Sequence, residues 1–211
     1  MQAARTRSER PPALPPETRT VGQLVAETVQ LYRQRFWISL PLGLSVAVLD
    51  QITFERTQFW QLVLSAAIGG VLLTVSYIGA SLIVAGQAPS LRGLDTAFAG
   101  GILAFLPAPF LIAVFVLPGL AWLALVGLVV PVATIEQRGL GDAFRRAIQL
   151  ARADYVHALG ALSTLVITYV ITRLVLVVLL HDSAGNVERV ASFLADLVLS
   201  PILFLGAALL Y

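Results

Sequence analysis

The chain has 211 residues, of which 58% are hydrophobic and only 12% are charged, and its mean hydropathy is +0.86. Soluble domains carry about 25% charged residues, so this composition excludes an ordinary soluble fold and predicts an integral membrane protein. The formal net charge is only +2, and the absence of cysteine excludes disulfides, thiol nucleophiles and cysteine-bound metals.

The N-terminal segment is polar. Residues 1–20 are rich in arginine and proline and have no apolar core, so they do not form a cleaved signal peptide. We predict a disordered cytoplasmic tail, with a proline-rich docking segment for a partner as the alternative. Residues 21–35 repeat apolar side chains at helical spacing, which predicts an amphipathic helix lying in the membrane interface.

Two apolar runs follow this helix. Residues 36–49 are short for a membrane crossing of about 30 Å and need part of the segment 50–54, which places Asp50 near the far boundary. Residues 60–86 predict a second and longer span. Small residues recur in it at four-residue spacing, a pattern typical of close helix contacts in lipid.

The longest uncharged stretch comes next, after a polar break at 87–101. Residues 96–135 contain no charged side chain over about 40 residues, roughly twice the length that one helix needs to cross the bilayer. Pro118 and Gly119 lie near its middle, and proline and glycine are the strongest local breakers of helices. We therefore predict a hairpin of two spans with its turn at Pro118–Gly119.

Residues 136–154 predict a second interfacial helix. One helical face carries the apolar residues Leu140, Phe144, Ala147, Ile148 and Ala151. The other face carries Arg145, Arg146 and Arg152, which we expect to contact anionic lipid headgroups at ~1 kcal/mol each.

The last two spans each contain one charge. Residues 155–180 and 190–211 form the fifth and sixth spans around a polar turn, and they carry Arg173 and Asp196. A charge in hydrocarbon costs ~2.5–3.5 kcal/mol. The two residues lie ~12 Å and ~10 Å below the same boundary, so we predict an ion pair between the spans. Independent snorkelling of each side chain to the surface is the alternative.

The predicted fold class is all-α: a polytopic membrane helical bundle of about six transmembrane helices with cytoplasmic amphipathic interfacial helices. Residues 21–211 form one transmembrane domain. Short similarities, such as Arg92–Phe98 with Arg138–Phe144, favour three two-span repeat units at 21–86, 87–135 and 136–211. Convergent composition of interfacial helices is the alternative.

The distribution of arginine predicts the orientation. All 14 basic residues are arginine, and with both termini in the cytoplasm 11 of them fall on the cytoplasmic side and 2 outside. This asymmetry agrees with the positive-inside rule. We expect a multi-pass protein of a bacterial plasma membrane, with N- and C-termini cytoplasmic.

A search for chemistry is negative. The sequence contains no phosphate-binding loop, dinucleotide fingerprint, nucleophile elbow or metal-ligand spacing. We predict no catalytic, cofactor-binding or metal-binding residues and no nucleic-acid partner.

Four segments carry a resemblance to a known family: Leu31–Trp37 (LYRQRFW), Leu117–Gly119 (LPG), Pro131–Glu136 (PVATIE) and Arg138–Arg146 (RGLGDAFRR). With them the chain resembles the membrane domain associated with some bacterial glycerophosphoryl diester phosphodiesterases and related stand-alone membrane proteins. The resemblance implies a six-span bundle in a bacterial plasma membrane. It implies no catalysis, because in that family the phosphodiesterase chemistry belongs to a separate soluble barrel domain.

Three functions compete. The first is a non-enzymatic scaffold or partner subunit in envelope or lipid-related processes, which contacts anionic lipid and a protein partner or a second copy. The second is a small transporter or permease-like subunit, supported by Arg173, Asp196 and the prolines within the spans. A water-accessible cavity reaching Arg173 would favour the transporter, and a packed pair would favour the scaffold. A lipid-modifying enzyme ranks last.

Overall fold

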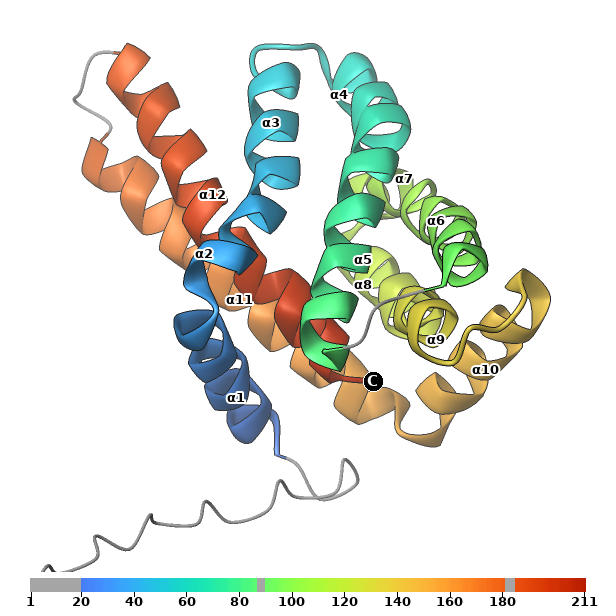
Figure 1. Ribbon diagram of the computed structural model, residues 1–211. Coiled ribbons are helices and arrows are strands. Elements are labelled where there is room, and N and C mark those ends of the chain that lie inside the picture. The colour runs from blue at the N-terminus through green and yellow to red at the C-terminus, as the bar shows by residue number, and fades with distance from the viewer. Residues whose placement is uncertain (1–19, 87–89, 181–184) are drawn as a thin grey trace, which may run out of the picture.

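The computed structural model describes residues 20–86, 90–180 and 185–211, which are helical with short connections and contain no strand (Figure 1). The predicted all-α fold class is confirmed. The predicted tail lies outside the described residues except for Thr20, which caps the first helix. Its hydroxyl accepts a hydrogen bond from the Gln23 backbone, and the Gln23 side chain accepts one from the Thr20 backbone.

The described helices are, in chain order, α1 (Val21–Gln34), α2 (Phe36–Ser39), the 3₁₀-helix η2 (Leu40–Gly43), α3 (Leu44–Thr53), α4 (Gln58–Leu64), the π-helix η3 (Ser65–Gly69), α5 (Gly70–Ala85), α6 (Leu91–Phe105), α7 (Ala108–Val114), α8 (Val116–Val126), α9 (Val129–Ile135), α10 (Leu140–Ala153), α11 (Tyr155–Leu180) and α12 (Gly185–Leu209).

Six stretches of the described chain are long and apolar enough to cross a membrane, which is the arrangement of a multi-pass membrane protein. They are Phe36–Thr53, Gln58–Ala85, Leu91–Val114, Val116–Ile135, Tyr155–Leu176 and Arg189–Leu209. The predicted number of spans is confirmed.

The polar break predicted at 87–101 is wrong over most of its length. Helix α6 begins at Leu91, because the Ser90 hydroxyl accepts a hydrogen bond from the Gly93 backbone at 3.1 Å and caps it. Arg92 and Asp95 therefore lie on the first turns of the third span. The three-unit repeat is not tested by the fold and stays a prediction.

The third and fourth spans form the expected hairpin, but its turn is not at Pro118–Gly119. Helices α7 and α8 are joined at Phe115, which is extended at φ −166° and ψ 145°. Pro118 instead lies in the first turn of α8. Backbone N–H groups in a first turn have no helical acceptor, so the N–H group that proline lacks costs little there. Gly119 lies against Ile112 of α7, where a β-carbon would overlap the isoleucine side chain.

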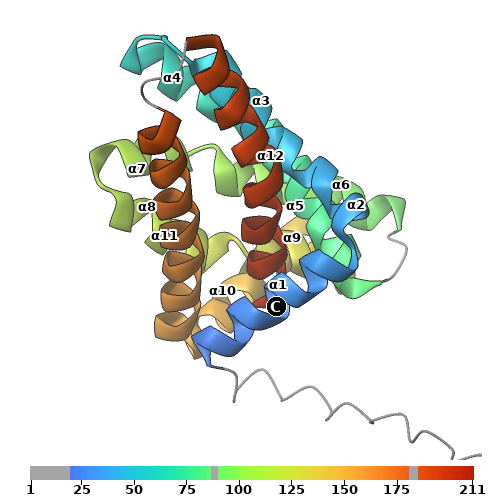
Figure 2. The ribbon, with the colours of Figure 1, turned by 90° about the vertical axis from the view of Figure 1, so that its left-hand side faces the viewer.

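Helix α12 is the central element of the bundle. It packs against α1, η2, α3, α5 and α11, and Figure 2 shows it between α11 on one side and α3 and α5 on the other. On the far side of α5, helices α6 and α9 pack against each other, and α9 is buried from Val129 to Thr134.

Both helices that the sequence analysis predicts outside the spans are present, and Figures 1 and 2 place α1, α10 and the C-terminus at one end of the molecule, opposite the α3–α4 connection. Their position in the membrane interface stays a prediction. Helix α1 buries Leu24, Thr28 and Tyr32. The buried line of α10 runs through Ala143, Ala147 and Ala151, so its centre is shifted from the predicted face to include Ala143. The larger residues Leu140, Phe144 and Ile148 are half-buried beside this line.

Glycine permits a direct backbone contact between two elements of the bundle. A β-carbon at Gly43 would overlap the backbone carbonyl of Leu197, so η2 and α12 touch backbone to backbone. Small residues allow this approach in lipid, where dispersion rather than water drives helix association.

We therefore expect Gly43→Ala to lower the stability of the protein by about 1–3 kcal/mol, the usual range for overpacking. The measurement is the thermal unfolding midpoint of the purified protein in detergent. Gly160→Ala in α11 is the matched control, since nothing lies within 4 Å of its β-carbon position. Equal midpoints for the two variants would contradict this packing.

Candidate functional site

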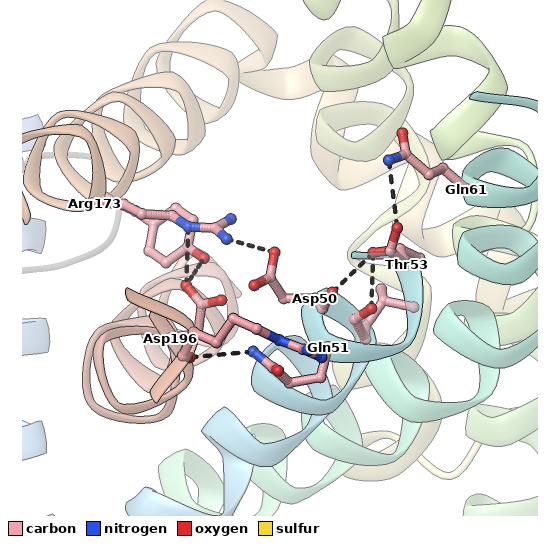
Figure 3. A network of polar contacts seen from close by, with 9 residues as sticks. Asp50, Gln51, Thr53, Gln61, Arg173 and Asp196 are labelled. Carbon is pink, nitrogen blue, oxygen red and sulfur yellow. Dashed lines mark hydrogen bonds and ion pairs between the residues drawn. The ribbon is translucent and has the colours of Figure 1, made fainter. Parts of the chain in front are cut away.

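The main polar feature of the spans is a network that joins three helices. Arg173 on α11 lies between Asp196 on α12 and Asp50 on α3 (Figure 3). Its Nε lies 3.5 Å from Asp196 Oδ1, which is the pairing that the matched depths predict. Its Nη2 donates a hydrogen bond to Asp50 Oδ1, a partner that the sequence analysis did not assign.

The fold explains why these residues meet. Helices α11 and α12 are consecutive and packed along each other, so charges at equal distances from their connection face the same level. Helix α3 packs on the other side of α12 and ends at Thr53, which brings Asp50 to that level. The boundary position of Asp50 was the available signal, but the sequence does not reveal that the first span is a neighbour of the sixth.

A tyrosine completes the network. Tyr169 lies one helical turn before Arg173, and its hydroxyl donates a 2.6 Å hydrogen bond to Asp196 Oδ1. The Asp196 side chain is 0% exposed, whereas those of Arg173 and Asp50 are 31% and 21% exposed. Asp196 Oδ2 is buried and has no hydrogen-bond partner among the described residues.

A second cluster lies at the end of the bundle that carries α10. Glu136, which follows α9, accepts a 2.7 Å hydrogen bond from the Tyr211 hydroxyl and a 3.4 Å bond from Arg146 Nε on the same oxygen. Its other oxygen accepts a bond from Arg138 Nε. The cluster ties the end of the sixth span to α9 and α10. Sequence reasoning missed Glu136 and Tyr211, because this contact joins distant segments.

Charge partners set the protonation of this second cluster. Partial burial opposes ionisation of Glu136, but hydrogen bonds from Tyr211, Arg138 and Arg146 and the charge of Arg138 outweigh it, so the Glu136 pKa lies below its usual value. Burial together with the adjacent Glu136 carboxylate raises the pKa of Tyr211. Glu136 is therefore a carboxylate and Tyr211 a neutral donor near pH 7.

The three arginines predicted to face lipid divide into two groups. Arg145 and Arg152 are exposed on the outer face of α10, whereas Arg146 turns back to Glu136 and is half-buried. The structure thus leaves Arg145 and Arg152 at the surface, and it makes Arg146 part of the Glu136 cluster.

An apolar cavity of about 170 Å³ lies inside the bundle, partly enclosed. Helices α3, α5, α6, α8, α11 and α12 line it, with Tyr77, Phe105 and Phe204 as the aromatic residues of its wall. A second and shallower pocket lies beside Gln51, Arg189 and Phe193. Neither Arg173 nor Asp196 lines either of these two pockets.

Within residues 20–86, 90–180 and 185–211, no group of three or more histidine, aspartate or glutamate side chains is placed to hold a metal ion. Comparisons of the chain with protein-family models, with curated proteins and with solved structures found no match. The resemblance to the phosphodiesterase-associated membrane domain stays a prediction.

Replacing Arg173 with glutamine should destabilise the bundle by about 3 kcal/mol, the lower end of the range for breaking a buried ion pair, since this guanidinium is part-exposed. The change leaves Asp50 and Asp196 without their shared cation. Thermal unfolding in detergent measures the loss. Arg56→Gln in the α3–α4 connection is the control, and a loss no larger than the control's would contradict the network.

The Glu136 cluster predicts an acid-sensitive contribution to stability. Because its pKa in the folded protein is lowered, the contribution is fully present above the ordinary value of 4.5 and is lost as the pH falls through the folded value. Unfolding midpoints from neutral pH downward should therefore fall more steeply for the wild type than for Glu136→Gln. Glu55→Gln, an exposed carboxylate in the α3–α4 connection, should behave like the wild type; identical slopes in all three would refute this contribution.

Proposed function

We propose that this protein is a non-enzymatic integral membrane protein of a bacterial plasma membrane that acts as a scaffold or partner subunit in a lipid- or envelope-related process. The observation that carries the proposal is helix α10, which lies across one end of the bundle as a fixed basic surface. The resemblance of the sequence to the phosphodiesterase-associated membrane domain points in the same direction.

The packing of α10 supports a permanent rather than a passing attachment. Its line of alanines at 143, 147 and 151 is at most 1% exposed and lies against the bundle, where α10 contacts α6, α8 and α9. Arg146 adds its bond to Glu136. The helix therefore cannot detach without exposing a packed face and breaking this cluster.

The outer face of α10 suits an anionic membrane surface. Arg145 and Arg152 are exposed there, and each arginine near an anionic headgroup contributes ~1 kcal/mol. Helix α1 and the C-terminus lie at the same end. Together with the arginine asymmetry of the sequence, this supports an inner-leaflet position for α10 and a cytoplasmic position for both termini.

A small transporter is the second candidate. Its support is the discontinuity of the spans, which change to a 3₁₀-helix at Leu40–Gly43, to a π-helix at Ser65–Gly69 and to extended backbone at Phe115. Broken helices are typical of transport sites. The packed Arg173 network, outside both pockets described above, favours the scaffold.

The proposal is tested by native mass spectrometry of the protein released from nanodiscs that contain phosphatidylglycerol. We expect the wild type to retain anionic lipid, and Arg145→Gln/Arg152→Gln to retain several-fold less. Arg56→Gln/Arg189→Gln, which removes the same charge at the opposite end, should retain as much as the wild type. Equal retention by all three proteins would overturn the lipid contact. A co-purifying subunit lost only from the α10 variant would identify the partner role.

The required sidedness has a direct check, because the natural chain contains no cysteine. A single cysteine at Gln149 of α10 should react with a membrane-impermeant maleimide only after the cells are permeabilised, and one at Arg56 should react in intact cells. The reverse pattern would overturn the inner-leaflet placement.

A further inference from the structure

The three-helix network contains more acid than base. Two carboxylates, Asp50 and Asp196, share the single guanidinium of Arg173, and both lie beneath it in Figure 3. With both acids ionised, the network carries one net negative charge inside the spans. An unbalanced charge at a buried site is strongly unfavourable, and a protein usually avoids it by neutralising the group.

The two carboxylates are not equivalent. Asp50 receives a direct hydrogen bond from Arg173 Nη2, and its side chain is 21% exposed. Asp196 Oδ1 accepts a 2.6 Å hydrogen bond from the neutral Tyr169 hydroxyl, but it meets Arg173 only through the longer 3.5 Å contact to Nε, and its side chain is 0% exposed. Its Oδ2 atom is buried without a hydrogen-bond partner among the described residues. Asp196 is therefore the acid whose negative charge is less well stabilised.

The elements packed around α12 supply little else to balance this charge. Helix α11 contributes Arg173 and Tyr169, and α3 contributes Asp50. The tyrosines Tyr32 of α1 and Tyr77 of α5 also reach α12, but they donate to the backbone carbonyls of Val198 and Ala207. The 3₁₀-helix η2, with sequence LPLG, has no titratable side chain.

We propose that Asp196 is a proton-binding site and is a neutral carboxylic acid at neutral pH, while Asp50 and Arg173 form the ion pair. A hydronium ion of the solvent transfers its proton to an Asp196 oxygen and leaves a water molecule, so one O–H bond breaks and one forms, and the charge of the network goes from minus one to zero. Two neighbouring carboxylates that compete for one cation favour this outcome, because the charge on one acid disfavours ionisation of the other. The inference goes beyond the proposed function and does not depend on it.

Loss of the proton would have a structural consequence. An ionised Asp196 competes with Asp50 for the same guanidinium, so the strong bond of Arg173 can move from α3 to α12. Protonation of one buried acid thus sets whether α3 or α12 receives the strong bond of Arg173.

The direct test is infrared spectroscopy of the full-length protein in an ester-free detergent at neutral pH. The carbonyl stretch of a protonated carboxylic acid should be present in the wild type and in the control Asp142→Asn, which removes an exposed acid of α10. It should be absent from Asp196→Asn. Absence from the wild type, or persistence in Asp196→Asn, would overturn the proposal.

Stability gives a second readout. Asparagine resembles the neutral acid, so Asp196→Asn should keep a wild-type unfolding midpoint, and its failure to fold would count against the proposal. The decrease in unfolding midpoint caused by Arg173→Gln should be smaller in the double variant with Asp50→Asn than in the double variant with Asp196→Asn. The opposite order would show that Asp196 is the ionised partner.

A metal cation is the alternative occupant of the site. If the wild-type midpoint rises with NaCl but not with choline chloride, and the infrared band is missing, a metal cation rather than a proton occupies the site.

Discussion

A charge placed inside a membrane bundle must find its counter-charge within the protein, and this constraint governs how the spans of this protein are joined. Arg173 satisfies it by contacting carboxylates on two other helices, so α3, α11 and α12 are fixed at one level. Apolar packing alone would allow these helices to slide along each other, because lipid solvates their surfaces as well as a neighbouring helix does. The network therefore fixes the positions of α3, α11 and α12 along their axes. Because α12 also packs against α1 and α5, these helices are aligned with the same level.

At the opposite end of the molecule, α10 is attached to the bundle by packing and by a cluster of polar contacts. There, α10 is held by a line of alanines and by the bonds of Glu136 to arginines and to Tyr211. The basic surface is thus part of the folded bundle, whereas an attached amphipathic peptide would come and go with the lipid composition. A fixed surface of this kind keeps the exposed side chains of Arg145 and Arg152 at a constant angle to the spans.

Hydropathy and helical period were sufficient to predict the six spans, both amphipathic helices and the pairing of Arg173 with Asp196, because each of these depends on local composition or on two consecutive helices. They could not assign Asp50 or Tyr211 to a cluster, since those contacts depend on which distant spans are neighbours. The misplaced hairpin turn has a local cause: proline suits the first turn of a helix as well as a reverse turn, and Gly119 serves the close contact of α8 with Ile112. Backbone contact at Gly43 had no distinctive signal among 16 glycines.

The π-helix at Ser65–Gly69 has its own consequence for the second span. An α-helix turns by about 100° per residue, so one additional residue in a turn rotates everything beyond it by about that angle. No residue of α4 is buried, whereas α5 turns Thr74, Tyr77 and Ser81 inward. Because of the wide turn, α4 and α5 present different faces to the bundle although they belong to one span. Deletion of one residue from the π-helix would rotate the inward-facing side chains of α5 about the helix axis without changing the sequence of α5.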